Sequence, residues 1–164
     1  MTCVRSTLLS PACVLLVLSL GLTACGTKNI PNTRIEDTDE NQEIVAFVER
    51  YRKAVEARDV AALRHMASQR YFDDMGTPNG DDDVDYDALM VGLTRLGTEI
   101  KDARYQISYR GVTYTARERV LVDLLYTGWF KVETPEGPQW RRRLEPHRIV
   151  LAREGSDYRI LSGM

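Results

Sequence analysis

The sequence predicts an α+β domain in which helices come first and an antiparallel sheet follows. Between residues 41 and 97, apolar residues recur every three or four positions, which is the spacing of a helix with one buried face. After residue 103 the spacing changes to two, as in a half-buried strand. Short links between long strands then favour an antiparallel meander.

Three helices are expected, and each has a residue suited to cap its start. Asn41, Asp59 and Asp85 carry short polar side chains that can accept hydrogen bonds from the free N–H groups of a first turn. The buried faces consist of Ile44, Phe47, Val48, Tyr51 and Val55, then Val60, Leu63 and Met66, and last Leu89, Met90, Leu93 and Leu96. Residues 73–85 are rich in Gly, Pro and Asp and are predicted to form a loop.

Four strands are expected over residues 105–114, 119–132, 139–153 and 158–162, with a bend at Gly111 in the first. One face of the second strand consists of Val120, Val122, Leu124 and Tyr126. N-terminal helices followed by four antiparallel strands favour a curved sheet that wraps around a helix and encloses a cone.

Composition excludes several classes of function. The chain has 164 residues, of which 43% are hydrophobic and 28% charged, as in a folded domain. Its formal charge of −2 argues against nucleic-acid binding. Its 3 cysteines are too few for a disulfide scaffold, and no cysteine–histidine cluster has zinc spacing. The sequence contains no P-loop, dinucleotide fingerprint or G-x-S-x-G elbow, so we predict no cofactor.

Residues 1–24 have the features of an export signal. Arg5 supplies the positive charge, and residues 8–22 form an apolar stretch too short for a transmembrane helix of about 20 residues. The stretch ends in Leu-Thr-Ala-Cys at residues 22–25, which resembles the lipobox of bacterial lipoproteins. The resemblance implies cleavage before Cys25 and acylation of that residue by chains such as palmitate. An ordinary secretory signal that is cut after alanine is the alternative.

The lipoprotein resemblance also predicts where the protein works. Residues 25–40 comprise the lipidated cysteine and a polar stretch without periodicity, which is predicted to be a flexible tether. Residues 41–164 are predicted to be the folded domain. Gly26 after the cysteine favours the outer membrane, so we expect the domain to face the periplasm from a lipid anchor in the cell envelope.

A second resemblance covers residues 41–164. The stretch IVAFVERYRKAVEARDVAALRHMASQRYF is a helix that runs through an Arg-Asp break into a short second helix. It resembles the start of the nuclear transport factor 2-like (NTF2-like) superfamily, which includes ketosteroid isomerase and SnoaL-like polyketide cyclases. The ending SDYRILSGM is similar to the closing strand of that superfamily. The resemblance implies a cystatin-like cone, and it does not choose among enzymes, binding modules and dimerisation domains.

Asp123 is the candidate catalytic residue, because a carboxylate buried in a strand rich in Val and Leu could act as a general acid or base. A ketosteroid isomerase-like enzyme would also need a donor to a developing oxyanion. The available donors are Tyr71, Tyr105 and Tyr109. The alternative is an ion pair across the sheet between Asp123 and either Arg141 or Arg143.

A basic strip and an aromatic cluster are the candidate binding residues. Arg141, Arg143 and His147 share one face of the third strand. They could meet anionic lipid headgroups, an acidic partner or the acidic loop of a second copy, or they could form cross-strand ion pairs. The aromatic residues Trp129, Phe130 and Trp140 could line a cone mouth or a dimer face, or pair across the sheet.

Two further patterns are interpreted as structural, and we predict no metal site. The aspartates of residues 81–87 suggest calcium, but Tyr86 stands where an EF-hand loop needs glycine. We therefore expect a solvated loop whose last aspartates favour the next helix. His65 and His147 lie far apart in the sequence without a third ligand, so each is expected at the surface or its boundary.

These observations favour a lipid-anchored envelope protein that binds or scaffolds in the periplasm. A second copy, an envelope protein and a small apolar ligand are its candidate partners. One alternative is an isomerase- or cyclase-like enzyme that uses Asp123. Another is a structural lipoprotein that recruits partners through its Arg-rich strand.

The lipid anchor gives the first testable prediction. We expect mass spectrometry of the chain start in the membrane fraction to find the mature protein beginning at an acylated Cys25. An unmodified Cys25 in that fraction would contradict the lipoprotein assignment.

Overall fold

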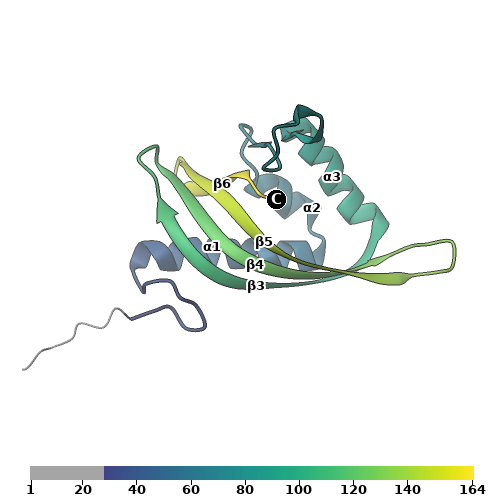
Figure 1. Ribbon diagram of the computed structural model, residues 1–164, viewed down its shortest axis with the longest axis horizontal. Coiled ribbons are helices and arrows are strands. Elements are labelled where there is room, and N and C mark those ends of the chain that lie inside the picture. Colours follow the sequence, from purple (N-terminus) through teal and green to yellow (C-terminus); the bar gives the residue numbers. More distant parts are fainter. Residues whose placement is uncertain (1–27) are drawn as a thin grey trace, which may run out of the picture.

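The structure, a computed structural model, describes residues 28–164 and confirms the predicted α+β class (Figure 1). The helices are α1 (Asp39–Ala57), α2 (Val60–Met66) and α3 (Tyr86–Glu99). The main sheet consists of β3 (Ile100–Tyr114), β4 (Arg119–Val132), β5 (Gln139–Glu154) and β6 (Asp157–Ser162). These strands are antiparallel in the order β3-β4-β5-β6, as expected for a meander. The predicted export signal, Cys25 and the first part of the predicted tether lie outside the described residues.

The loop before α3 contains structure that the sequence did not predict. Two short strands, β1 (Phe72–Asp73) and β2 (Val84–Asp85), pair antiparallel within it, and a 3-10 turn, η1 (Gly80–Asp82), lies between them. The expected cap is confirmed where the loop ends, because the Asp85 carboxylate accepts the Ala88 N–H at 2.9 Å. The pairing of β1 with β2 places Asp73 opposite Val84.

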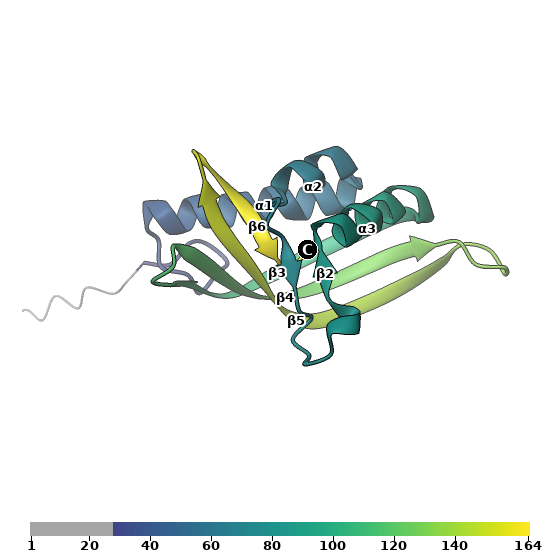
Figure 2. The same ribbon diagram turned by 90° about the horizontal axis from the view of Figure 1, so that it is seen from above.

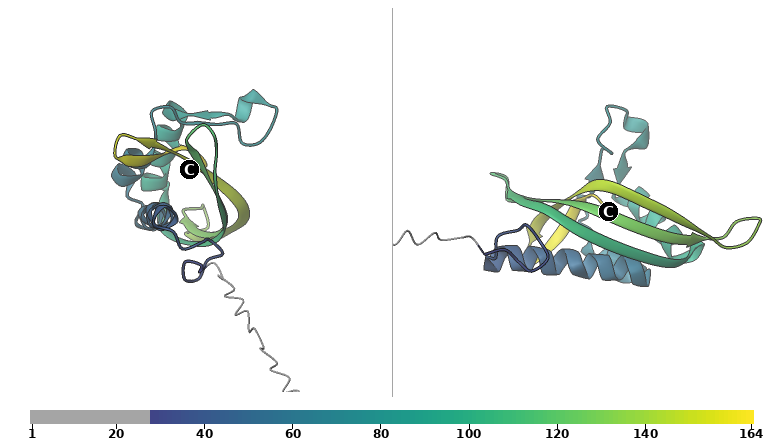
Figure 3. Two further views of the ribbon diagram at one scale, coloured as in Figure 1. Left: turned by 90° about the vertical axis from the view of Figure 1, so that its left-hand side faces the viewer. Right: turned by 60° about the horizontal axis from the view of Figure 1, so that its bottom comes forward.

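The main sheet is strongly curved, and the helices lie along one side of it (Figures 2 and 3). On β4, buried residues that point to the concave face alternate with half-buried residues that point outward. The inward set begins with Val120, Val122, Leu124 and Tyr126, all of them buried. The pairing of β3 with β4 shifts register between Tyr109 and Gly111, where the sequence predicts a bend. Such an irregularity increases local twist and helps the sheet to curl.

Helix α1 starts earlier than predicted, and its cap is not Asn41. The Thr38 hydroxyl accepts the Asn41 N–H at 3.2 Å, which makes Thr38 the N-cap. The Asn41 side chain is buried instead, where it donates to the Glu36 carbonyl and accepts from the Tyr114 hydroxyl. The expected cap of α2 is confirmed, because Asp59 accepts the Ala62 N–H at 2.9 Å.

Residues 28–38, which the sequence assigns to a flexible tether, pack against the domain. Asn29 and Glu36 form an isolated antiparallel bridge, and the Ile30 N–H donates to the Ile35 carbonyl at 2.9 Å. The Ile35 side chain is only 3% exposed and belongs to the core. Two isoleucines in a polar stretch were too weak a pattern to predict this, so the ordered domain begins before Asn41.

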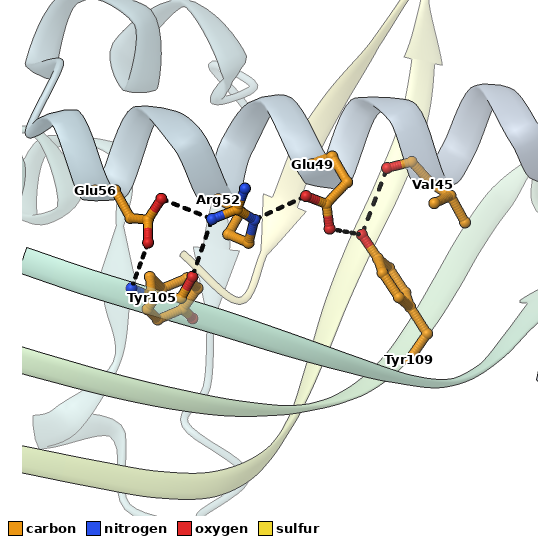
Figure 4. A network of polar contacts seen from close by, with 6 residues as sticks. All are labelled: Val45, Glu49, Arg52, Glu56, Tyr105 and Tyr109. Carbon is orange, nitrogen blue, oxygen red and sulfur yellow. Dashed lines mark hydrogen bonds and ion pairs between the residues drawn. The ribbon is translucent and has the colours of Figure 1, made fainter. Parts of the chain in front are cut away.

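Helix α1 is joined to the edge strand β3 by a network of charged side chains (Figure 4). The Glu56 carboxylate accepts the Tyr105 N–H at 3.0 Å, and the Arg52 guanidinium donates to the Tyr105 carbonyl at 3.2 Å. Arg52 also pairs with Glu49 at 2.7 Å and with Glu56 at 2.6 Å. The Tyr109 hydroxyl donates to Glu49 at 2.9 Å. Helix side chains thus bind main-chain groups that an edge strand would otherwise leave without a partner.

We predict that Glu56→Ala lowers the free energy of unfolding by about 1–3 kcal/mol, because the partly buried Tyr105 N–H loses its acceptor. Denaturant titration of the purified protein measures this change. Lys53→Ala, at an exposed position of the same helix, is the matched control and should change stability by less than about 0.5 kcal/mol. Equal losses in the two variants would contradict the role assigned to Glu56.

Candidate ligand-binding cavity

A cavity of about 550 Å³ lies between the helices and the concave face of the sheet. Its helical side is largely aliphatic, with side chains from α1, α2 and α3, and Arg95 and Glu99 of α3 also line it. The aliphatic residues that line it include Val55, Leu63, Leu89, Leu93 and Leu96. Gly92 on α3 also lines the cavity, and apart from its chain neighbours and the adjacent helix backbone no atom lies within 4 Å of the point where its Cβ would stand. The volume is in the range of small-molecule sites.

Three tyrosines line the cavity: Tyr105 and Tyr126 come from the sheet, and Tyr51 comes from α1. The Tyr105 ring stacks on the Tyr126 ring at a centroid distance of 5.1 Å, and the Tyr51 ring meets Tyr105 edge-on at 6.3 Å. Burial raises the pKa of Tyr51 and of Tyr105 well above the usual value for a phenol. Both hydroxyl groups therefore stay protonated at neutral pH and can donate hydrogen bonds to a ligand.

A glycine makes this arrangement of rings possible. Gly128 on β4 lies directly opposite Tyr105 on β3. A Cβ at Gly128 would come within 2.6 Å of the Phe130 ring and 3.4 Å of the Tyr105 ring. A larger residue here would displace the Phe130 and Tyr105 rings, both of which line the cavity.

His147 and Arg143 complete the polar side. Both lie on β5 and line the cavity, because the pairing of β5 with β4 puts them on the same face as Tyr126. The His147 ring meets the Tyr126 ring edge-on at 5.5 Å, and its Nε2 lies 2.9 Å from the Gly163 carbonyl oxygen. The Tyr126 hydroxyl donates to Glu145 at 3.3 Å. The largely aliphatic part of the cavity lining thus faces a part that carries hydroxyl, imidazole and guanidinium groups.

Asp123, the predicted catalytic carboxylate, does not line the cavity. Its side chain is on the outer face of the sheet, because the neighbouring Val122 and Leu124 point inward. It pairs with Arg148, directly opposite on β5, at 2.7 Å. The ion-pair alternative thus describes the environment of Asp123 in the structure, but the partner is Arg148 rather than Arg141 or Arg143.

The predicted oxyanion donors are in three different environments. Tyr105 lines the cavity. Tyr71 is buried beside it, where its hydroxyl donates to Asp73 at 3.4 Å and accepts from the Met164 N–H at 3.1 Å. Burial raises the pKa of Tyr71 to about 12. The Tyr109 hydroxyl is engaged by Glu49 of α1 and is not among the residues that line the cavity.

The predicted aromatic cluster is divided between the two faces of the sheet. Phe130 points inward and lines the cavity. Trp129 and Trp140 are on the outer face, where the Arg142 guanidinium lies 5.7 Å from the Trp129 ring and the Arg104 guanidinium 5.2 Å from the Trp140 ring. Both tryptophans therefore pack across strands, and neither lines the mouth of the cone.

The basic strip is confirmed as one face of β5, and that face is the concave one. Arg143 and His147 line the cavity, whereas Arg141 is exposed and donates to Gln139 at 3.1 Å. His65 is exposed on α2.

Within residues 28–164 no group of three or more His, Cys, Asp or Glu side chains is arranged to hold a metal ion. No helix in the same range is long and apolar enough to cross a membrane.

Sequence reasoning missed two members of the site, Tyr51 and Tyr126. Both were assigned to apolar faces, Tyr51 in the first helix and Tyr126 at the end of the inward row of β4. The available signal was their hydroxyl group, since a tyrosine in a row of aliphatic residues needs a partner or a cavity for its O–H. The contribution of α3 could not be predicted, because its distance from the sheet depends on the tertiary packing.

Comparison with solved structures identifies the fold. A candidate scytalone dehydratase from Novosphingobium aromaticivorans aligns with a TM-score of 0.64 at 10% identity, over 76% of this chain and 80% of that one. A candidate dehydratase of the NTF2-like family from Streptomyces avermitilis gives 0.59 at 13% identity, over 75% and 92%. An uncharacterised Caulobacter vibrioides protein with a cystatin-like fold gives 0.58 at 14%, over 77% and 87%.

The domain therefore has the NTF2-like, cystatin-like cone fold, as the second sequence resemblance implied. No protein-family model matches the chain, and no curated protein matches it in sequence. At these identities the structural likeness establishes the fold alone, so the function has to be argued from the cavity.

Proposed function

We propose that the chain is a lipid-anchored envelope protein whose NTF2-like domain binds a small, largely apolar molecule. The observation that carries this proposal is the two-sided cavity of about 550 Å³. Aliphatic side chains of the helices would hold the body of the ligand, and Tyr51, Tyr105, Arg143 and His147 would hold one polar group. The cavity favours binding over pure scaffolding, for which a filled interior is expected.

The lipid anchor is proposed from the sequence alone. The Leu-Thr-Ala-Cys motif at residues 22–25 would supply the modified cysteine, and few residues separate it from Lys28, the first residue that the structure describes. The domain would then stay close to the membrane, where apolar molecules partition.

Filling the cavity tests the proposal. Gly92→Phe places a ring where the structure has open space next to Cβ, and it removes a helix-weakening glycine. We expect wild type to bind the fluorescent probe anilinonaphthalene sulfonate, and Gly92→Phe to weaken that binding at least tenfold without loss of thermal stability. Val91→Phe, at a residue of the same helix that is 56% exposed, is the matched control. Absence of binding to wild type, or unchanged binding to Gly92→Phe, would contradict the proposal.

A second candidate function is acid–base catalysis by His147 in place of Asp123. Two observations favour it: His147 lines the cavity beside neutral tyrosine donors, and two structural neighbours are named as dehydratases. In such a reaction the His147 imidazole removes a proton from the carbon atom next to a carbonyl group. The hydroxyl group on the adjacent carbon then leaves as water with a proton from a tyrosine.

Dehydration of the aldol adduct of acetone and para-nitrobenzaldehyde tests this candidate, because loss of water forms a conjugated enone that absorbs in the near ultraviolet. We expect acceleration by wild type and loss of at least about a hundredfold in His147→Ala. His65→Ala, at an exposed position, should keep the wild-type rate. No acceleration by wild type would leave binding as the function of the cavity.

A further inference from the structure

The orientation of His147 is set by a main-chain carbonyl. Its Nε2 lies 2.9 Å from the Gly163 oxygen, and a carbonyl oxygen can only accept a hydrogen bond. The hydrogen must therefore be on Nε2, and in the neutral ring the lone pair is on Nδ1. Among residues 28–164 no side chain or main-chain group forms a hydrogen bond with Nδ1. His147, which lines the cavity, thus has a ring nitrogen, Nδ1, that can accept a hydrogen bond from a ligand.

Asp73 binds the same glycine through its N–H. The Gly163 N–H donates to Asp73 Oδ2 at 2.7 Å. Gly163 is buried and has a φ of 86°, and a Cβ there would come within 2.2 Å of the Arg148 oxygen. Only glycine fits this position without strain, so glycine allows the chain to donate its N–H to Asp73 and to present its carbonyl to His147.

A second contact fixes the same segment. The Tyr71 hydroxyl donates to Asp73 Oδ2 at 3.4 Å and accepts the Met164 N–H at 3.1 Å. Met164 lines the cavity next to His147. The Met164 N–H and the Gly163 carbonyl belong to the same peptide group. Asp73 therefore binds the Gly163 N–H directly and holds the next peptide group through Tyr71, although it does not touch His147.

We infer that Asp73 is a positioning residue for His147, and that the cavity selects ligands that carry a hydroxyl group. Asp73 holds the two peptide groups on either side of Gly163, one directly and one through Tyr71. The Gly163 carbonyl keeps the hydrogen of His147 on Nε2, and Nδ1 accepts the hydroxyl hydrogen of the ligand. Arg143 and the Tyr51 hydroxyl are available to donate to the ligand oxygen. The inference rests on the proposed binding function and names the polar group of the ligand.

Two matched probes test the ligand class. Para-cyclohexylphenol carries a hydroxyl hydrogen, and para-cyclohexylanisole is the same molecule with that hydrogen replaced by methyl. We expect calorimetric titration of the full chain to show that the phenol binds about fivefold to tenfold more tightly, the range of one net hydrogen bond. Equal affinities would overturn the inference and leave the proposed binding function standing, whereas binding of neither probe would count against the binding function itself.

Variants of Asp73 test its positioning role. We expect Asp73→Ala to remove the preference for the phenol while the anisole affinity stays unchanged, and Asp73→Asn, which keeps an acceptor oxygen, to restore most of the preference. The nitrogen-15 shifts of the His147 ring should report hydrogen on Nε2 in wild type and a mixture of tautomers in Asp73→Ala. Asp74→Ala removes the neighbouring exposed carboxylate, which contacts the Gly76 N–H instead, and should behave as wild type.

The tautomer of His147 distinguishes a positioning role of Asp73 from a purely structural one. If Asp73→Ala lowers both affinities equally and leaves the His147 nitrogen shifts unchanged, Asp73 only stabilises the fold and the inference is overturned.

Discussion

The attachment of α1 to the main chain of Tyr105 is the constraint on which the cavity depends. β3 is an edge strand of the sheet, and its outward N–H and C=O groups would otherwise face solvent. Glu56 and Arg52 bind these two groups, and both side chains come from successive turns of one helix. These two hydrogen bonds therefore fix the position of α1 along β3. The Tyr105 ring is directed to the concave side, where it stacks on Tyr126.

The order of the elements could be predicted from the sequence because each depends on local spacing. The second strand was predicted with its observed bounds, Arg119 to Val132, since apolar residues occupy its alternate, inward positions. The start of α1 was not predicted, because Thr38 and Asn41 have equally suitable side chains for capping. Only the tertiary contact of Asn41 with Tyr114 distinguishes them, and that contact joins residues far apart in the chain.

The candidate site was harder to predict than the fold. Asp123 has apolar neighbours in the sequence, but alternate residues of a strand point to opposite faces, and an acidic residue between two buried ones lies on the outer face. His147 and Arg143 were correctly grouped on one face of a strand. Which side of the sheet that face occupies depends on the register between β4 and β5, and no local pattern encodes it.

The outer location of both tryptophans has a consequence for spectroscopy. The chain contains 2 tryptophans, and each packs beside a guanidinium on the convex face. Indole emission should therefore report on the hairpin between β4 and β5 and remain largely insensitive to events inside the cone. The stacked tyrosines are the natural chromophores of the interior, so near-ultraviolet circular dichroism in the phenol band is the optical signal to follow when the cavity is occupied.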